Sequence, residues 1–518
     1  MYDSDILSLR GITKIYGNGI VANHDVNFSV RKGEIHALIG ENGAGKTTLM
    51  KILYGIEQAD RGDILINDEV VTISSPKDAI SHGIGMVQQH FQLVPSLTVA
   101  ENLVLGREPH HGMLFDRMEA EKICEEYSKL YNLPVDPTKQ VRDISVSEKQ
   151  KLEILKALLG GAKILILDEP TAVLTPQEIS VFFDQLKLLK EKGHTIIFIS
   201  HRLNELLEIS DRMTVIRAGR TIGTYETHGC NAQHISKLIV GRDVVLKVEK
   251  DPPKPGKTIL AVNNLTVRNS YGKKAVDDIS FTVRSGEIVG IAAVEGNGQK
   301  EVVDAITGTT SYSHGSITLD GIDINSYSPK KLREKMSYIS EDRNTVGSAR
   351  DSSIQDNLIT LRRSEKALYS GAFLSRNALK NLCDRMIEEY EIKCDGKDSP
   401  MSMLSGGNAQ KVVVAREVDR EPELLVAQQP TRGVDVGSVE FIHKQIVKKR
   451  DEGSAILLIS ADLGEVISLS DSLIVMHNGK ISAYFPSTAE LSEEDVGAYM
   501  LGLEPQSEEM VRKAYHEE

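Results

Sequence analysis

The sequence contains no run of about eighteen uninterrupted apolar residues, the length that a helix needs to cross a bilayer. Its N-terminus lacks the charged and then apolar stretch of a secretory leader. Its four cysteines form no CxxC pair, a spacing typical of redox and metal sites. We therefore expect a chain that neither spans a membrane nor is exported. We expect the four cysteines to be reduced and to pack in the interior, namely Cys124, Cys230, Cys383 and Cys394.

An excess of positive charge is also missing, because the formal net charge is −13 at pH 7. This charge argues against a duplex-binding surface that neutralises phosphates, so we expect no nucleic-acid partner. Hydrophobic residues make up 40% and charged residues 26% of the chain, as in a soluble globular protein with a packed core. A length of 518 residues is too great for one core and predicts two or more domains.

One long internal repeat organises the chain. The segment FSVRKGEIHALIGENGAGKTTLMKILYG starts at Phe28 and returns as FTVRSGEIVGIAAVEGNGQKEVVDAITG from Phe281. Further on, GAKILILDEPT returns as EPELLVAQQPT, and TIIFISHRLNEL returns as AILLISADLGEV. A repeat of this length indicates two homologous domains in tandem. The proline- and lysine-rich stretch KVEKDPPKPGK between them predicts a short, exposed linker.

Each half has the pattern of an α/β domain. Continuous apolar runs such as EIHALIG, KILILD and TIIFIS predict buried parallel strands, while TLMKILYG and PQEISVFFDQLKLLKEKG show helical spacing. The segments that follow MVQQHF and YISEDR predict a smaller, mainly helical subdomain in each half. We place the first domain at residues 5–243, the linker at 244–257, the second domain at 258–505 and a C-terminal tail at 506–518.

The stretch GENGAGKTT satisfies the phosphate-loop pattern G-x-x-x-x-G-K-[ST] between an expected strand and an expected helix. The backbone N–H groups of such a loop surround phosphate oxygens, and the helix N-terminus adds positive potential. Lys46 would reach the β- and γ-phosphates, and the Thr47 hydroxyl would bind Mg²⁺. The expected nucleotide-binding residues are Gly40, Glu41, Asn42, Gly43, Ala44, Gly45, Lys46, Thr47 and Thr48. A chance glycine-rich turn is the alternative, which the strand and helix on either side disfavour.

Two acidic residues end the strand ILILDE. Asp168 would place a carboxylate at the edge of the sheet beside the phosphates, where it can hold Mg²⁺. Glu169 is suited to orient or deprotonate the attacking water. His201 ends another strand and is expected to contact the γ-phosphate, and Gln89 is expected to contact Mg²⁺ and the water. Taken one at a time, these residues also have non-catalytic interpretations. Asp168 and Glu169 could be a solvated acidic pair, His201 a structural histidine and Gln89 an ordinary loop residue.

The order of phosphate loop, glutamine loop, signature, Asp-Glu strand and histidine resembles that of ABC-type ATPases, twice and over nearly the whole chain. The resemblance implies two P-loop NTPase domains, each with a RecA-like core, a helical subdomain and an antiparallel β subdomain. It also implies that the domains sandwich ATP head to tail, so that each site joins the phosphate loop of one domain to the signature of the other. The second-half signature LSGGN places a serine and two glycines at an anion-binding helix end.

Under this pairing the first composite site is intact. Its expected residues are Lys46, Thr47, Gln89, Asp168, Glu169 and His201, closed by Ser405, Gly406 and Gly407 from the second half. For Ser405 a plain helix cap is the alternative reading. The family also implies that Tyr16 in KIYGNG stacks on adenine, against an ordinary strand-end tyrosine. Tyr271 is its counterpart only if a small gap is allowed.

The second composite site is degenerate at every corresponding position. The replacements are Gln299 for the lysine, Lys300 for the Mg²⁺ hydroxyl, Glu341 for the glutamine, Gln428 and Gln429 for the carboxylates, and Ala461 for the histidine. Its signature, ISVSE, has lost both glycines. Random decay would scatter such losses over both sites, so the clustering favours one working site. We expect the second site to hydrolyse ATP at least about 10³-fold more slowly.

The stretches DEPTAVLT, VEGNGQ, ISEDR and PTRGVDVGS resemble the ATP-binding subunit of bacterial importers for monosaccharides and nucleosides. GIGMVQQHFQLVPSLTVAENL is most similar to the nucleoside branch, whose relatives also import riboflavin or simple sugars. The resemblance implies ATP and Mg²⁺ as cofactors, two transmembrane permease subunits, an extracytoplasmic substrate-binding lipoprotein and a peripheral position on the cytoplasmic face of the membrane. The permeases would engage grooves near residues 89–102 and 341–357.

A soluble tandem ABC protein that acts on the ribosome is the alternative. Such proteins usually keep both sites and have a long charged helical linker, whereas this chain has one stripped site and a short linker. A regulatory protein that uses ATP only as a switch is a third possibility, which Glu169 and His201 disfavour.

Overall fold

The computed structural model describes residues 5–17, 19–41, 43–88, 91–112, 114–171, 174, 176–200, 202–240, 250–269, 272–294, 296–370, 373–503 and 505–515. It divides into two compact units, residues 1–244 and 245–518. Each unit has its own sheets and its own hydrophobic core. Within the described ranges, no helix combines the length and the apolar character needed to cross a membrane.

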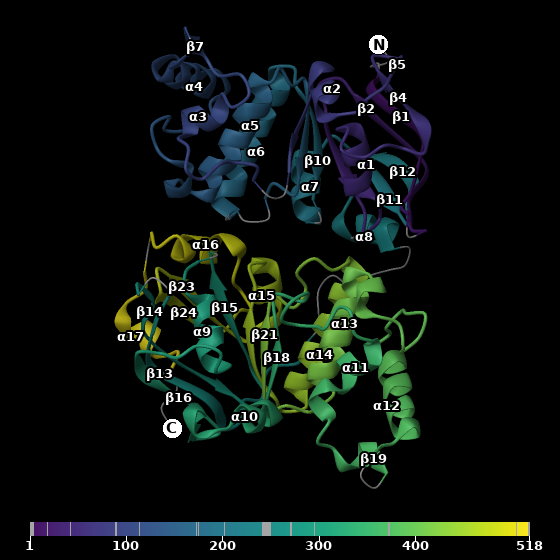
Figure 1. The fold of residues 1–518 in the computed structure, drawn as a ribbon. Helices are drawn as coiled ribbons and strands as arrows, with labels where there is room; N and C mark the ends of the chain where they lie inside the picture. Colours follow the sequence, from purple (N-terminus) through teal and green to yellow (C-terminus); the bar gives the residue numbers. More distant parts are fainter. Residues whose placement is uncertain are drawn as a thin grey trace. The chain divides into compact units, whose positions relative to one another are not determined.

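A six-stranded sheet forms the centre of the first unit (Figure 1), in the order β12-β11-β3-β10-β9-β6. Its strands are β3 (Ile35–Ile39), β6 (Ile84–Val87), β9 (Ile164–Asp168), β10 (Thr195–Ile199), β11 (Arg212–Arg217) and β12 (Arg220–Glu226). All neighbours are parallel except β11 and β12. Every residue of β3, β9 and β10 is buried, which is why their sequences are continuously apolar. The prediction of buried parallel strands is confirmed.

A second, antiparallel sheet in this unit has the order β2-β1-β4-β5. Its strands are β1 (Asp5–Ile15), β2 (Val21–Arg31), β4 (Arg61–Ile66) and β5 (Glu69–Val71). The residues of β1 and β2 partly alternate between buried and exposed, as expected when one face packs on a core. This sheet confirms the antiparallel β subdomain that the resemblance implied.

The helices of the first unit fall into two groups. Those that accompany the sheets are α1 (Lys46–Leu53), α2 (Pro76–Ser81), α6 (Pro176–Glu191), α7 (Leu203–Ile209) and α8 (Ala232–Val240). The helical subdomain consists of α3 (Val99–Leu103), α4 (Arg117–Tyr131) and α5 (Val146–Leu159), which pack on one another. A hairpin, β7 (His110–His111) with β8 (Leu114–Phe115), lies between α3 and α4, so the segment is mainly helical as predicted.

The second unit repeats this plan. Its central sheet has the order β18-β21-β22-β15-β23-β24 and its antiparallel sheet the order β14-β13-β16-β17. The strands are β13 (Thr258–Arg268), β14 (Lys274–Arg284), β15 (Ile288–Ala293), β16 (His314–Leu319), β17 (Ile322–Asp323), β18 (Met336–Ile339), β21 (Leu424–Gln428), β22 (Ala455–Ile459), β23 (Ser472–His477) and β24 (Lys480–Phe485). The fold class predicted from the sequence is therefore confirmed in both halves.

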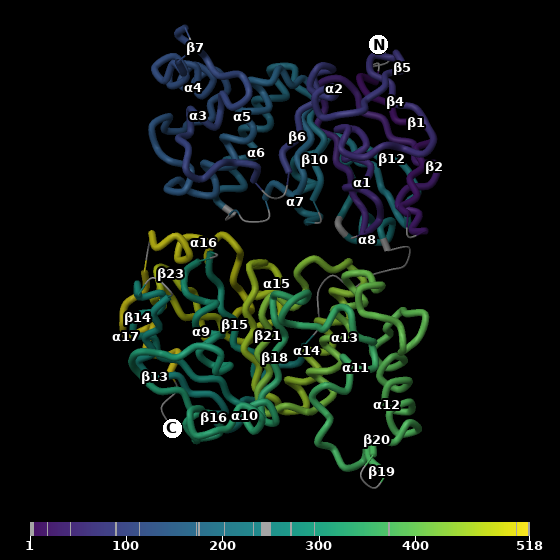
Figure 2. The backbone as a smooth tube through the Cα atoms, viewed as in Figure 1, coloured from purple at the N-terminus to yellow at the C-terminus, as the bar shows by residue number. Residues whose placement is uncertain are grey.

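The helices of the second unit are α9 (Gln299–Ile306), α10 (Pro329–Lys335), α11 (Ile354–Ile359), α12 (Arg376–Glu389), α13 (Gly406–Val418), α14 (Val436–Asp451), α15 (Leu463–Leu469), α16 (Glu493–Met500) and α17 (Glu508–Arg512). Helices α9 to α16 follow the order of α1 to α8 in the first unit, and α17 is additional within the described part of the chain. Helices α11, α12 and α13 form the helical subdomain, and a hairpin of β19 (Tyr369–Ser370) and β20 (Phe373–Leu374) precedes α12. The C-terminal helix α17 packs on β24. Figure 2 shows α17 in yellow, towards the C-terminal end of the chain. Beyond α17, buried Ala514 accepts a hydrogen bond from the Thr282 N–H of β14.

Only residues 250–257 of the predicted linker lie within the described chain. The Lys250 ammonium donates to the carbonyls of Leu469 and Ser470, at 2.9 and 2.5 Å, where α15 ends. It also lies 3.3 Å from Asp471. Residues 251–257 are exposed. Lys250 therefore fastens the start of the second unit to the end of α15, and the Arg450 guanidinium adds a hydrogen bond to the Asp251 carbonyl at 2.9 Å.

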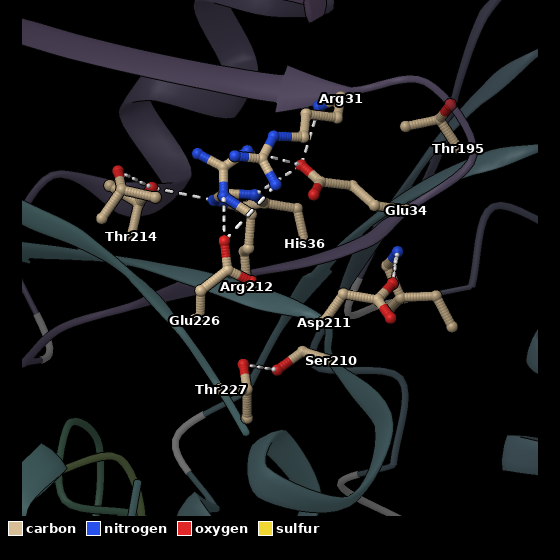
Figure 3. A network of polar contacts seen from close by, with 12 residues as sticks. Arg31, Glu34, His36, Thr195, Ser210, Asp211, Arg212, Thr214, Glu226 and Thr227 are labelled. Atoms are coloured by element: carbon tan, nitrogen blue, oxygen red, sulfur yellow. Dashed lines mark hydrogen bonds and ion pairs between the residues drawn. The ribbon is translucent and has the colours of Figure 1, made fainter. Parts of the chain in front are cut away.

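A buried polar network fixes the N-terminal end of β3 (Figure 3). His36 is fully buried, with Nδ1 2.9 Å from Glu34 Oε1 and Nε2 2.8 Å from Thr214 Oγ1 on β11. Burial acts to raise the pKa of Glu34, but hydrogen bonds from His36 and the Arg31 N–H outweigh it and hold the pKa below the ordinary 4.5. The Arg212 guanidinium, 3.4 Å from Glu34, acts in the same direction. The network ties β3 to β11 at the strand end opposite the phosphate loop.

Candidate functional site

The phosphate loop of the first unit joins β3 to α1. Gly43 and Gly45 have left-handed φ angles of 80° and 99°, and Gly45 is the residue that precedes the first turn of α1. The Lys46 ammonium, in a residue that is only 7% exposed, folds back to the carbonyls of Gly40 and Glu41 at 2.7 and 2.9 Å. The loop is thus closed by its own lysine, with the N–H groups at the start of α1 free of helical partners.

Two glycines of this loop have no room for a side chain. A Cβ on Gly40 would lie 2.1 Å from the Ile216 carbonyl oxygen, and one on Gly45 would lie 2.3 Å from the Ala22 carbonyl oxygen. Both contacts are with backbone oxygens, and relieving them would require the main chain to shift. Packing therefore requires glycine at Gly40, the left-handed φ favours it at Gly43, and both reasons apply at Gly45.

The sheet order brings the two carboxylates next to the phosphate loop. β10 lies between β3 and β9, and all three run parallel, so their C-terminal ends meet at one edge. Asp168, the last residue of β9, is 8% exposed. Glu169 follows with a left-handed φ of 50°, and its N–H donates to the Ile199 carbonyl of β10 at 2.9 Å. The predicted neighbours Lys46, Asp168 and Glu169 are brought together.

The electrostatics of this edge show a buried cation between two carboxylates. Burial lowers the pKa of Lys46, and the charges of Glu169 and Asp168 oppose that shift. Burial and then the charge of Glu169 raise the pKa of Asp168 to about 6, against the opposing effect of Lys46. A bound cation would favour the ionised form of Asp168, whose pKa the neighbouring carboxylate raises.

The oxygen donors at this edge fit Mg²⁺. Thr47 is exposed at the start of α1, so its hydroxyl is accessible, and Asp168 offers a carboxylate on the neighbouring strand end. Hard divalent cations prefer such oxygen ligands. When bound, Mg²⁺ would neutralise charge on the phosphate oxygens.

Three predicted residues, Asn42, Gln89 and His201, lie outside the described residues. Tyr16 follows the end of β1, and its hydroxyl lies 3.4 Å from Thr48 Oγ1 on α1. The structure thus places Tyr16 beside α1, the helix that follows the phosphate loop. Adenine stacking on Tyr16 stays a prediction. Tyr271 also falls outside the described residues.

The phosphate loop of the second unit keeps the backbone shape and loses the charge. Gly298 has a φ of 99°, and Gln299 stands where the first unit has Lys46. Its Nε2 donates to the Val294 carbonyl at 3.1 Å, which repeats the bond from Lys46 to Glu41. Lys300, in place of the exposed hydroxyl, pairs with Asp304 at 3.0 Å, and that hydrogen bond raises the pKa of Lys300. A cation in this position does not fit a Mg²⁺ ligand.

The two glutamines that replace the carboxylates have their oxygens occupied. Gln428 Oε1 accepts a hydrogen bond from the Tyr338 hydroxyl at 2.7 Å. Gln429 Oε1 accepts from the Ala461 N–H at 3.1 Å, and Gln429 keeps the left-handed φ of 48°. Glu341, at the glutamine-loop position, lies 3.8 Å from the Arg432 guanidinium. The two glutamine oxygens are thus already hydrogen-bonded within the unit, and the Glu341 carboxylate is ion-paired.

Tyr338 is the site residue that sequence reasoning missed. It lies on β18, which pairs with β21, and its counterpart in the first unit is Met86 on β6. An aromatic hydroxyl in a buried strand was the available signal, because such a group usually finds a polar partner. Its partner, Gln428, follows only from the sheet order.

The two signature helices begin differently. In α5, Ser145 and Glu148 form a reciprocal capping box, which places a carboxylate at the helix N-terminus. In α13, Ser405 caps the helix and accepts from the neutral Asn408 side chain at 2.9 Å. A Cβ on Gly407 would lie 2.1 Å from Asp435 Oδ2. Of the two helices, α5 carries a carboxylate in its own first turn, whereas α13 carries none, and the nearby Asp435 carboxylate accepts hydrogen bonds from Ser438 of α14.

A protein-family model described as ABC transporter matches residues 23–172 and 276–432, once in each unit. The chain belongs to the ABC transporter family. It is an ABC-type ATPase, and its two matched segments contain the phosphate loops and Asp-Glu or Gln-Gln strand ends described above. Nucleotide binding follows from the family.

Three known proteins show how far the similarity of this ABC ATPase extends. The nucleoside import ATP-binding protein NupA of Lactococcus lactis is 42% identical over 97% of this chain and 99% of its own length. The guanosine import ATP-binding protein NupO of Bacillus subtilis is 43% identical over 96% of this chain and 97% of its own. A crystal structure of the archaeal ribosome recycling factor aABCE1 with the stalk protein aP1 matches 91% of this chain and 88% of that chain, with a TM-score of 0.58. At 18% identity, that match shows the fold alone.

Proposed function

We propose that this ABC ATPase energises an importer of nucleosides and that the first unit's phosphate loop carries out the hydrolysis. The single observation behind the hydrolysis assignment is the asymmetry between the halves. Lys46, Asp168 and Glu169 stand together in the first unit, while Gln299, Gln428 and Gln429 replace them in the second. The nucleoside assignment is supported by the names of NupA and NupO and by their identity over nearly full length.

The proposed roles follow from the chemistry of each side chain. Lys46 and the N–H groups at the start of α1 bind the phosphates. Thr47 and Asp168 hold Mg²⁺, together with Gln89. Glu169 orients and deprotonates the attacking water, and His201 contacts the γ-phosphate. Tyr16 stacks on the adenine ring.

We further propose that the second unit's signature closes this site, as the family resemblance implies. The serine and glycines at the start of α13 are then the groups that meet the γ-phosphate, namely Ser405, Gly406 and Gly407. If the first unit's own signature closed this site instead, the Glu148 carboxylate of α5 would lie near a phosphate, which is electrostatically unfavourable. The degenerate site then serves as a scaffold or passive clamp.

The proposed partners are two transmembrane permease subunits and an extracytoplasmic substrate-binding lipoprotein. In this assembly the ATPase lies on the cytoplasmic face of the membrane as a peripheral subunit. Coexpression with candidate permease subunits, followed by copurification, tests this directly. The chain is expected in the membrane pellet with permeases and in the supernatant without them.

The substrate is tested on the binding protein that copurifies. A ligand that binds only the folded state raises the unfolding midpoint. Nucleosides are expected to raise it, and riboflavin and simple sugars are the comparison compounds. Stabilisation by sugars alone would move the assignment to the sugar branch, and stabilisation by none of the compounds would remove the proposed substrate class.

A ribosome-associated role is the alternative weighed from the sequence, and the similarity to aABCE1 supports only the shared fold. Sucrose-gradient fractionation separates the two. Sedimentation with ribosomes, rather than with permease-containing membranes, would replace the importer assignment.

A further inference from the structure

A buried asparagine contacts the phosphate loop from the neighbouring β sheet. Asn23 on β2 has no exposed surface, and its Nδ2 donates to the Gly45 carbonyl oxygen at 3.1 Å. That oxygen also accepts the Leu49 N–H at 2.9 Å in the first turn of α1. The side chain therefore holds the residue immediately before Lys46.

Stability does not explain an asparagine in this place. Its Oδ1 is buried and has no hydrogen-bond partner in the described part of the chain. An unsatisfied buried acceptor destabilises a protein, whereas an apolar group of similar shape is neutral or stabilising there. The unpaired Oδ1 thus offsets the stability that the Nδ2 bond contributes.

The second unit provides an internal comparison. Val276 stands at the corresponding position of β14, and its Cγ2 lies 3.3 Å from where a Cβ on Gly298 would be. The other bond to the loop is present in both units. The Gly219 N–H donates to the Ala44 carbonyl at 3.1 Å, and the Gly479 N–H donates to the Asn297 carbonyl at 3.1 Å. The asparagine bond is therefore found where the lysine and both carboxylates are found, and a methyl group replaces it where they are lost.

We propose that Asn23 is a positioning residue for ATP hydrolysis. The Gly45 carbonyl and the Lys46 N–H are the two ends of one planar trans peptide, so a bond that fixes the carbonyl direction also fixes the N–H on the opposite side. That N–H belongs to Lys46, the first residue of α1, where the proposed site binds phosphate. Asn23 acts through this peptide and does not touch the nucleotide. The inference rests on the proposed function of the first unit's site.

The experiment compares steady-state ATP turnover and thermal unfolding of the full chain and its variants. Asn23→Val places in the first unit the residue that the second unit already accommodates in the same frame, and Asn23→Leu tests a side chain of similar shape. We expect kcat/KM for ATP to fall about tenfold, the value of one oriented hydrogen bond, with most of the loss in kcat. The unfolding midpoint should stay level or rise, because an unsatisfied acceptor is removed.

Two matched variants separate the possible failures. Val276→Asn makes the reverse change in the second unit and should leave turnover unchanged, since that unit lacks the lysine. Lys46→Ala should abolish turnover, and if it does not, the proposed site itself is wrong. If Lys46→Ala is inactive while both Asn23 variants keep full kcat/KM, only the positioning role is refuted. Loss of activity in proportion to a lowered unfolding midpoint in both Asn23 variants would likewise assign the residue a structural role alone.

Discussion

Glu169→Gln should stop ATP turnover while leaving the first unit folded, because the second unit already holds a glutamine in the same backbone frame. Gln429 has a φ of 48° and Glu169 a φ of 50°. Their N–H groups donate to the equivalent carbonyls of Ile459 and Ile199 at 2.7 and 2.9 Å. Glutamine at position 169 therefore adds no strain and removes only a charge and a proton acceptor.

The expected loss follows from that change. A positioned proton acceptor contributes about 10²–10⁴ in rate, which corresponds to about 2.7–5.4 kcal/mol of transition-state stabilisation. ATP binding should not weaken, because the variant removes a negative charge beside the buried Lys46 and beside the phosphates. We therefore expect kcat to fall by at least about 10² while KM stays level or decreases.

Phosphate release at saturating Mg²⁺ and ATP gives kcat, and differential scanning calorimetry gives the unfolding midpoint. The midpoint should change by less than about 2 °C if the frame tolerates glutamine. Gln429→Glu is the matched control and should create no turnover, since Gln299 and Gln428 remain. Retention of more than about a tenth of the wild-type kcat in Glu169→Gln would refute the assignment of the water-activating base.

Three further results are expected. Glu34→Gln should lower the unfolding midpoint at pH 7, and the difference should shrink as the pH falls from 4.5 through the lower pKa of folded Glu34. A depressed carboxylate pKa stabilises fully above the unfolded value and is lost as the folded carboxylate is protonated, which a pH series of unfolding scans measures. Burial raises the pKa of Cys124 to about 12 and of Cys383 to about 11, so native alkylation at pH 8 should modify only the two half-buried cysteines, as peptide mass mapping can show. Gly407→Ala should destabilise the second unit by about 1–3 kcal/mol and lower turnover, whereas Ser147→Ala in the other signature should do neither; urea unfolding and phosphate release distinguish them.

Much of the fold follows from local sequence patterns. The strand-loop-helix context of GENGAGKTT and the apolar runs that end in Asp168 and Gln428 were sufficient, because phosphate loops and buried strands depend on neighbouring residues. Because the two halves are repeats, each element predicted in one half also predicted its counterpart in the other.

Contacts between distant segments could not be predicted in the same way. Tyr338 reaches Gln428 because β18 and β21 are neighbours in the sheet, which no local pattern specifies. The difference between Asn23 and Val276 is visible when the repeats are aligned, but its meaning depends on β2 packing against Gly45. Such pairings arise from tertiary topology, so sequence periodicity has no access to them.

The hydrogen bond from Tyr338 to Gln428 has a consequence for the history of the second unit. Restoring one carboxylate there would still leave a neutral Gln299 in the phosphate loop and a lysine at position 300. No single reversion therefore yields an intermediate with improved turnover on which selection could act. The proposed loss of catalysis in this half would therefore be hard to reverse one substitution at a time, and an engineered symmetric chain would need all of these positions changed together.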